Sequence, residues 1–248
     1  MEIIDSHLHI GNISDTGIVT ANEVRSHLTA MGVANGLVMP IAMRGGNDDW
    51  ETHRTLYQEA IAVGFDVALY VNTQMLAQSE NLAKFWIFPF KALKIHPDAV
   101  DFSTQRIEQV CSIAEKNKLP LMIHTGADES CRCERFRPFI QNHPKLTFVL
   151  CHARPSEEAF PMMREFPNLL IDTAFLPFKE LASNISEEIE DRIMFGSDFP
   201  VNRWFPHLGD EVQWYQKQIS DIQDKLSEKK AKKILYENFK QLYKGNCK

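Results

Sequence analysis

The chain has 248 residues, of which 44% are hydrophobic and 24% charged, and its formal net charge is -6. This composition excludes a fibrous or disordered protein, and the acidic charge argues against nucleic acid or anionic lipid as the main partner. No apolar run approaches the roughly 20 residues of a membrane span, MEIIDSHLHIG is not a signal peptide, and the five cysteines follow no disulfide framework, so we expect a cytoplasmic protein with free thiols.

Eight short apolar runs, many of them rich in β-branched residues, are typical of buried strands. In chain order they are Ile3–His9, Asn35–Pro40, Val67–Thr73, Ala92–His96, Leu121–Thr125, Thr147–His152, Leu169–Thr173 and Ile193–Asp198. Between them lie segments of helical period, namely Ala21–Met31, Glu51–Val63, Ser103–Asn117, Glu134–Asn142, Ser156–Glu165 and Phe178–Ile189. Two serines, Ser103 and Ser156, mark helix starts.

Two further segments complete the pattern. Met75–Phe88 predicts only a weak helix, and Trp86–Phe90 is an alternative buried apolar turn. Asp210–Lys248 predicts two closing helices.

Strand–helix alternation repeated eight times predicts an α/β protein with a parallel sheet. A single (β/α)8 TIM barrel with an extra C-terminal helix typically needs about 250 residues, so residues 1–248 would form one barrel domain. An open doubly wound sheet is the alternative on pattern alone. No GxGxxG or GxxxxGK[ST] follows a strand, so the features of a dinucleotide-binding or P-loop fold are missing.

Residues of metal-ligand type stand at the carboxyl ends of predicted strands, where a parallel barrel has its active site. His7 and His9 are two positions apart on one strand, so both point to the same side. Two imidazoles make half of a divalent metal site, and His124 and Asp198 can supply the rest. Asp198 lies beside the two histidines only if the barrel closes.

These motifs resemble the amidohydrolase superfamily, most closely its amidohydrolase-related branch, over nearly the whole chain. The family's H-x-H motif stands as His7-Leu8-His9, preceded by Asp5. The later motifs are LMIHTG with His124, FVLCHA with His152 and IMFGSDFP with Asp198. The segment ILYENFKQLY is similar to the branch's closing helix.

The resemblance implies a role for each residue. His7, His9, His124 and Asp198 would hold a divalent metal, most often zinc; Asp198 would also take the proton from metal-bound water. His152 would orient that water or polarise the substrate. The implied activity is hydrolysis of an amide, ester or lactone bond in a small substrate. A non-oxidative decarboxylase with the same ligands, and a barrel that binds metal without turnover, are the alternatives.

Lys94 leaves the number of metal ions open. Binuclear members of the superfamily carry a carbamylated lysine at the end of strand 4, and KIHP resembles that motif. In that case His124 and His152 would bind the second metal. We favour one ion, because the amidohydrolase-related branch is usually mononuclear.

Several residues on the same side of the barrel are candidates for substrate contact. They are His96, Arg44, Arg154 and Arg203, and a convergence of such cations would suit a carboxylate-bearing substrate. The aromatic residues Trp50, Phe175, Phe199 and Trp204 could wall the pocket. Specificity would come from the short loops Met43–Trp50, Ala127–Cys133 and Phe199–Leu208.

The cysteines and the oligomeric state complete the expectations. Cys131 and Cys133 are expected to be free thiols. Cys151 has the opposite strand parity to His152 and is predicted to pack against the helices. A homodimer is an open alternative to a monomer.

Overall fold

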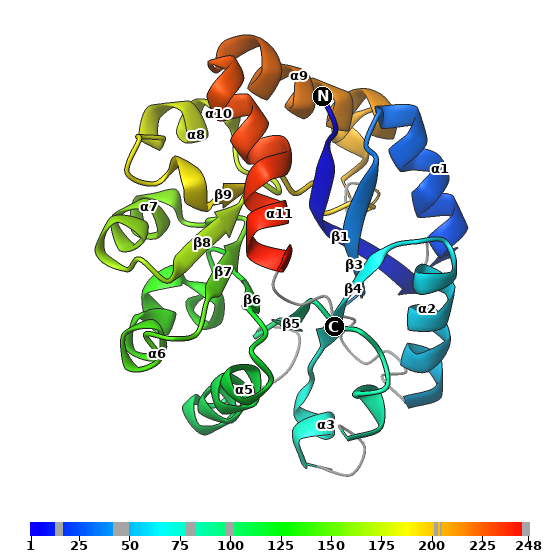
Figure 1. Cartoon of the computed structure of the whole chain (residues 1–248), viewed down its shortest axis with the longest axis vertical. Coiled ribbons are helices and arrows are strands. Elements are labelled where there is room, and N and C mark those ends of the chain that lie inside the picture. The colour runs from blue at the N-terminus through cyan, green and yellow to red at the C-terminus, as the bar shows by residue number, and fades with distance from the viewer. Residues whose placement is uncertain are drawn as a thin grey trace.

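The computed structural model describes residues 1–12, 17–41, 50–77, 83–97, 102–200, 203 and 205–244. A ring of parallel strands carries helices around its outside (Figure 1). The parallel strands are β1 (Ile4–Asn12), β3 (Asn35–Pro40), β4 (Asp66–Tyr70), β5 (Ala92–Ile95), β6 (Leu121–His124), β7 (Phe148–Cys151), β8 (Leu169–Asp172) and β9 (Ile193–Met194). All eight predicted strands are present, and the short β2 (Ile18–Val19) forms an antiparallel pair with β1 that the sequence did not predict.

The sheet closes between β1 and the segment that follows β9. The backbone N–H of Ser6 donates to the carbonyl of Phe195 at 2.8 Å, and the N–H of His9 donates to the carbonyl of Phe199 at 2.8 Å. Between them the N–H of Asp198 donates to the carbonyl of His7 at 2.9 Å. The predicted barrel is therefore confirmed, and its closure places Asp198 beside the first strand.

The described helices lie close to their predicted positions. They are α1 (Ala21–Met31), α2 (Trp50–Ala62), α3 (Thr73–Ala77), α5 (Thr104–Asn117), α6 (Arg137–Asn142), α7 (Ser156–Glu165), α8 (Phe178–Asn184), α9 (Glu211–Lys225), α10 (Glu228–Lys232) and α11 (Asn238–Tyr243). The Ser103 hydroxyl caps α5 by accepting the N–H of Arg106, as predicted. Ser156 is the first residue of α7, but the cap position is Pro155 and no side chain caps this helix.

Three helical predictions differ from the structure. The helix expected over Phe178–Ile189 ends at Asn184, and the one expected from Glu134 begins with a 3-10 turn at Cys133–Phe136. Within the weak third helix predicted over Met75–Phe88, the described residues form the end of α3 and a helical segment at residues 83–85. The chain then turns through an apolar segment in which Phe85 and Phe90 are buried and Ile87 is 72% exposed.

A β-bulge in β1 decides which side chains of this strand face the barrel interior. Asp5 pairs with Gly36 and Leu8 pairs with Val38, so β1 uses one more residue than β3 over this stretch. Ile4 packs with the interior cluster, whereas Leu8 packs with the layer between sheet and helices. The extra residue exchanges the two faces, so that His7 and His9 point inward beyond the bulge.

The core has two layers. The larger layer fills the space between the sheet and the outer helices. The smaller fills the barrel interior and consists of Ile4, Leu37, Met39, Ala68, Ala92, Met122, Val149, Cys151, Leu170, Met194, Phe239 and Tyr243. The last two belong to α11, which lies across the amino-terminal end of the barrel (Figure 1). The predicted C-terminal closing helix is therefore present.

None of the described helices is long and apolar enough to cross a membrane.

The prediction for Cys151 is wrong, because its side chain belongs to the barrel interior and not to the layer under the helices. Val149 and Cys151 form the inward face of β7, so regular alternation would turn His152 outward. His152 instead has a φ of +73° and Ala153 a φ of +48°, which ends the strand. This left-handed turn brings the imidazole of His152 back to the open end of the barrel.

Candidate active site and metal centre

Three side chains converge at the carboxyl end of the barrel. The Nε2 atoms of His7 and His9 lie 3.2 Å apart. The Oδ1 atom of Asp198 lies 3.1 Å from the first of these nitrogens and 2.9 Å from the second. All three residues are buried. The structure thus brings together two histidines from β1 and an aspartate that follows β9, nearly two hundred residues later in the chain.

The remaining ring nitrogens of both histidines are already engaged. Nδ1 of His7 lies 2.9 Å from Oδ2 of Asp172, and Nδ1 of His9 donates to the carbonyl of Pro40 at 3.3 Å. With the protons held at Nδ1, the Nε2 atoms present lone pairs to the common point. Burial, and then the charge of Lys94, lowers the pKa of His7 below its ordinary value. Two imidazole nitrogens and one carboxylate are a donor set that fits zinc or a similar divalent ion.

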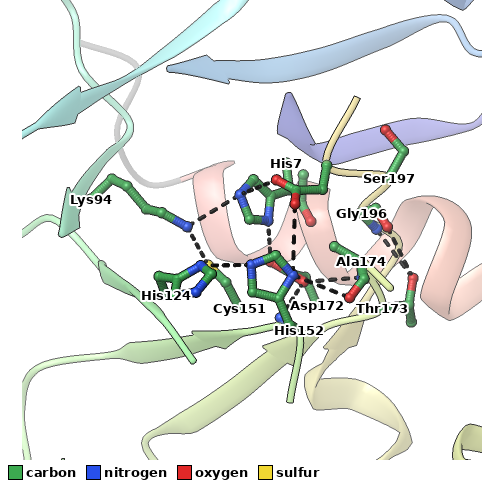
Figure 2. Close-up of polar contacts among 12 residues, drawn as sticks. His7, Lys94, His124, Cys151, His152, Asp172, Thr173, Ala174, Gly196 and Ser197 are labelled. Carbon is green, nitrogen blue, oxygen red and sulfur yellow. Dashed lines mark hydrogen bonds and ion pairs between the residues drawn. The ribbon is translucent and has the colours of Figure 1, made fainter. Parts of the chain in front are cut away.

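Asp172 is a site residue that the sequence analysis missed. Its side chain stands at the end of β8, fully buried, and its Oδ1 accepts the backbone N–H groups of His152 at 2.9 Å and Ala174 at 3.1 Å. Burial alone would raise the pKa of Asp172, but the electrostatic interaction and the hydrogen bond with His7 hold it below its ordinary value. The carboxylate therefore supports both His7 and the left-handed turn at His152 (Figure 2). In the sequence, the position of Asp172 at the end of a predicted strand, in the segment LLIDT, could have identified it as a site residue.

His152 joins His124 to the cluster. Its Nε2 atom lies 3.0 Å from Nδ1 of His124, and its Nδ1 atom donates to the carbonyl of Ala174 at 3.2 Å. Ligand atoms of His7, His152 and Asp198 all lie within 4.8 Å of one another. Burial, followed by neighbouring positive charges, lowers the pKa of both His124 and His152 well below the ordinary value. His124 is thus brought next to the centre through His152.

Lys94 reaches the same centre from β5. Its Nζ atom lies 3.2 Å from Nε2 of His7 and 3.0 Å from Sγ of Cys151, and the residue is 1% exposed (Figure 2). Burial raises the pKa of the Cys151 thiol well above its ordinary value, so the sulfur keeps its proton. The lysine nitrogen therefore faces the histidine nitrogen that a metal ion would use.

The residues around Asp198 keep its carboxylate ionised. Burial alone would raise its pKa, but the electrostatic interaction with His7, followed by the interactions with His9, holds the pKa below its ordinary value. Asp5 fixes the backbone on both sides, because its Oδ1 accepts the N–H of His7 at 2.9 Å and the N–H of Ser197 at 3.0 Å. Because Asp198 is a buried carboxylate that stays ionised, it can hold a cation and accept a proton.

The residues predicted to contact the substrate lie in different surroundings. The ring of His96 stacks on His124 with centroids 3.7 Å apart. Arg154 follows His152 and has a buried Nε atom with no hydrogen-bond partner among the described residues. Arg203 forms ion pairs with Glu23 and Glu211, and these two carboxylates balance its charge. Arg44 lies outside the described residues.

The predicted aromatic walls are only partly where we expected them. The Phe175 ring lies 6.5 Å from that of His152, so Phe175 borders the site. Phe199 is fully buried and packs on Tyr215 in the core. Trp204 and the side chain of Trp50 lie outside the described residues.

Four cysteines are described, Cys111, Cys131, Cys133 and Cys151, and all four are free.

Comparison with solved structures shows the same fold. An uncharacterized TIM-barrel protein from Bordetella bronchiseptica is 16% identical, with 99% of each chain covered and a TM-score of 0.72. A putative 2-pyrone-4,6-dicarboxylic acid hydrolase from Pseudomonas putida is 13% identical, covers 100% of this chain and 99% of its own, and has a TM-score of 0.69. A 4-oxalomesaconate hydratase from Rhodopseudomonas palustris is 16% identical, with 98% and 95% covered and a TM-score of 0.62.

The sequence comparisons assign the family. No curated protein sequence matches this chain. The family model described as amidohydrolase matches residues 4–245, which contain every member of the histidine and aspartate cluster. The resemblance seen in the motifs is therefore confirmed, and the chain belongs to the amidohydrolase family, a family of metal-binding enzymes that act on small molecules.

Proposed function

We propose that this protein is a metal-dependent hydrolase that cleaves an amide, ester or lactone bond in a small substrate. The observation that carries the proposal is the convergence of His7 Nε2, His9 Nε2 and Asp198 Oδ1, whose separations are 3.2, 3.1 and 2.9 Å. Contacts of this kind between lone-pair donors are unfavourable without a cation between them. We propose one ion, with zinc as the favoured metal and His124 as the further ligand.

When bound, the metal would lower the pKa of a water molecule and polarise the scissile carbonyl group. The residues themselves would manage the proton. Asp198 is held ionised, and its Oδ2 atom would take the proton of the attacking water and return it to the leaving group. His152 is kept neutral by burial and would orient the water or the substrate carbonyl group beside Asp198.

A carboxylate-bearing substrate is our proposal for the substrate class. The support is Arg154, because its guanidinium offers a buried, unpartnered Nε–H next to His152. His96 and Arg44 are further proposed contacts, whereas the ion pairs of Arg203 make it the weakest candidate. A structural relative is named for a dicarboxylic acid, which agrees with this class.

Turnover experiments test the proposal. The purified protein is supplied with zinc and given a panel of small lactones, esters and amides with and without a carboxylate, while a parallel assay of carboxylic acids measures release of CO2. We expect hydrolysis without CO2 release, and CO2 release would favour the decarboxylase alternative. Arg154→Met should raise KM for the carboxylate-bearing substrates at least about tenfold. The matched variant Arg203→Met should leave that KM unchanged.

The free thiols support a further proposal, a cytoplasmic location in a reducing compartment.

A further inference from the structure

A hollow of about 340 Å³ is lined by residues of α8, of α9 and of the segment that follows β8. Most of its wall is apolar and comes from Phe175, Leu176, Phe178, Leu181, Trp214 and Ile222. None of the three converging residues of the metal centre lines it. We call this hollow the α8–α9 pocket. Its volume lies within the range of pockets that hold small organic molecules.

Phe175 is the wall that the α8–α9 pocket shares with the active site. Its ring lies 6.5 Å from the ring of His152 on one side and 5.0 Å from the ring of Trp214 on the other. Its φ of +53° is rare for a bulky side chain and is retained only where the surroundings enforce it. Phe175 therefore lines this pocket and also lies beside His152.

The two charged residues that line the pocket, Lys217 and Asp221, form an ion pair with each other. Asp221 forms ion pairs with Lys217 and Lys225. The Lys225 ammonium also lies 5.1 Å from the centre of the Phe178 ring. Because the charges of the two lining residues are paired with each other, the pocket lining offers no strong attraction for an ionic ligand.

One polar group of the pocket lacks a partner. Nε2 of Gln218 is buried and has no hydrogen-bond partner among the described residues, although Gln218 lines the pocket. A buried amide donor without an acceptor is unfavourable, and the terminal torsion of glutamine turns easily. A ligand with a hydrogen-bond acceptor could therefore satisfy this donor.

From this combination we propose that the α8–α9 pocket binds a neutral, ring-sized molecule that carries a hydrogen-bond acceptor. Trp214, Phe175 and Phe178 would contact the ring by edge or offset stacking, and Gln218 would donate to the acceptor. The molecule could be the ring portion of a substrate or a separate regulatory ligand, since both present the same chemistry. Binding itself does not depend on the hydrolase proposal.

The test uses two probes that differ in one group. Acetophenone carries a ring and a carbonyl acceptor, and ethylbenzene has nearly the same shape without the acceptor. Titration of the full chain, followed by calorimetry and ligand-observed NMR, should show saturable one-to-one binding of acetophenone. Ethylbenzene should bind about fivefold more weakly. Absence of saturable acetophenone binding at millimolar concentration would overturn the proposal.

Variants locate the binding. Leu181→Trp fills the pocket and should abolish binding of both probes, with folding checked by circular dichroism. Gln218→Met keeps the volume and removes the donor, so it should bring the two affinities within about twofold of each other. The matched control Gln213→Met, at an exposed position of the same helix, should behave like the wild type. Equal discrimination by Gln218→Met and the wild type would contradict the proposal, even if Leu181→Trp does not fold.

Competition distinguishes the two sources of the ligand. A substrate found in the hydrolysis panel is added to the complex with acetophenone. Displacement of acetophenone identifies the pocket as the place of the substrate's own ring, and simultaneous binding identifies a separate ligand. Either result supports the site, and failure to find any hydrolysed substrate leaves the binding measurement intact.

Discussion

Asp172 Oδ2 lies 2.9 Å from Nδ1 of His7, and neither side chain is exposed to solvent. The contact fixes the ring so that Nε2 of His7 carries the lone pair facing His9 and Asp198. Asp172, which is not a member of the proposed ligand set, thus holds one ligand of that set in the form that can bind a cation.

Asp172→Asn is expected to weaken metal binding about 10- to 100-fold without removing a ligand. The amide oxygen can still accept the N–H of His152, but the amide can no longer hold the Nδ1 proton of His7 as a carboxylate does. Competition with a chromophoric chelator measures the affinity. The control Asp224→Asn changes an exposed aspartate and should leave it unchanged. A wild-type affinity in Asp172→Asn would refute the role of this contact.

Lys94→Met is expected to strengthen binding of a single divalent ion, by about tenfold or more. The lysine nitrogen lies 3.2 Å from Nε2 of His7, and an ammonium at that place repels an incoming cation. Metal affinity and stoichiometry, measured by titration and elemental analysis, check the expectation. Weaker binding, or a fall from two ions to one, would instead show that Lys94 is a carbamylated ligand.

Asp5→Asn should alter how stability depends on pH in the metal-free protein. Burial raises the pKa of Asp5 from 3.8 to about 7, so between these values the folded protein binds a proton that the unfolded chain releases. Stability from this group is therefore lost as pH rises through the window. Asparagine does not titrate and keeps the acceptor for the N–H groups of His7 and Ser197.

Urea unfolding of both proteins at pH 5 and pH 8 makes the comparison. The variant should gain stability relative to the wild type at the higher pH, by on the order of a few kcal/mol. A difference in unfolding free energy that is the same at both pH values would exclude a raised pKa for Asp5.

Tyr243→Phe should raise the free energy of unfolding by about 1 kcal/mol. The Tyr243 hydroxyl is buried at the amino-terminal end of the barrel and has no hydrogen-bond partner among the described residues. Phenylalanine keeps the ring against Phe239, whose centroid lies 4.6 Å away. Chemical denaturation measures the change, and a loss of stability of similar size would mean that the hydroxyl is hydrogen-bonded.

Strand alternation explains which parts of this molecule could be predicted from the sequence. The apolar runs and helical periods identified the eight barrel strands and their order. The spacing of His7 and His9 placed both on one face, as the structure has them. The position of Asp198 followed from closure of the barrel alone, and that closure is observed in the backbone hydrogen bonds from Ser6 to Phe195 and from His9 to Phe199.

Local departures from alternation explain what could not be predicted. The bulge between Asp5 and Leu8 exchanges the faces of β1, and the left-handed turn at His152 returns that side chain to the site. Both depend on tertiary contacts, such as the hydrogen bond from the His152 N–H to Asp172. Regular parity therefore assigned Cys151 to the wrong side of the sheet.

Metal content of the purified protein and of its His9→Ala variant tests the central claim most directly. Each protein is stripped with a chelator, dialysed against a small excess of zinc and analysed for bound metal per chain. The wild type should hold one ion per chain. His9→Ala removes one proposed metal ligand and should leave the fold in place, so this variant should hold almost none. A wild type that binds no divalent metal, or a variant that binds as much as the wild type, would contradict the proposed centre.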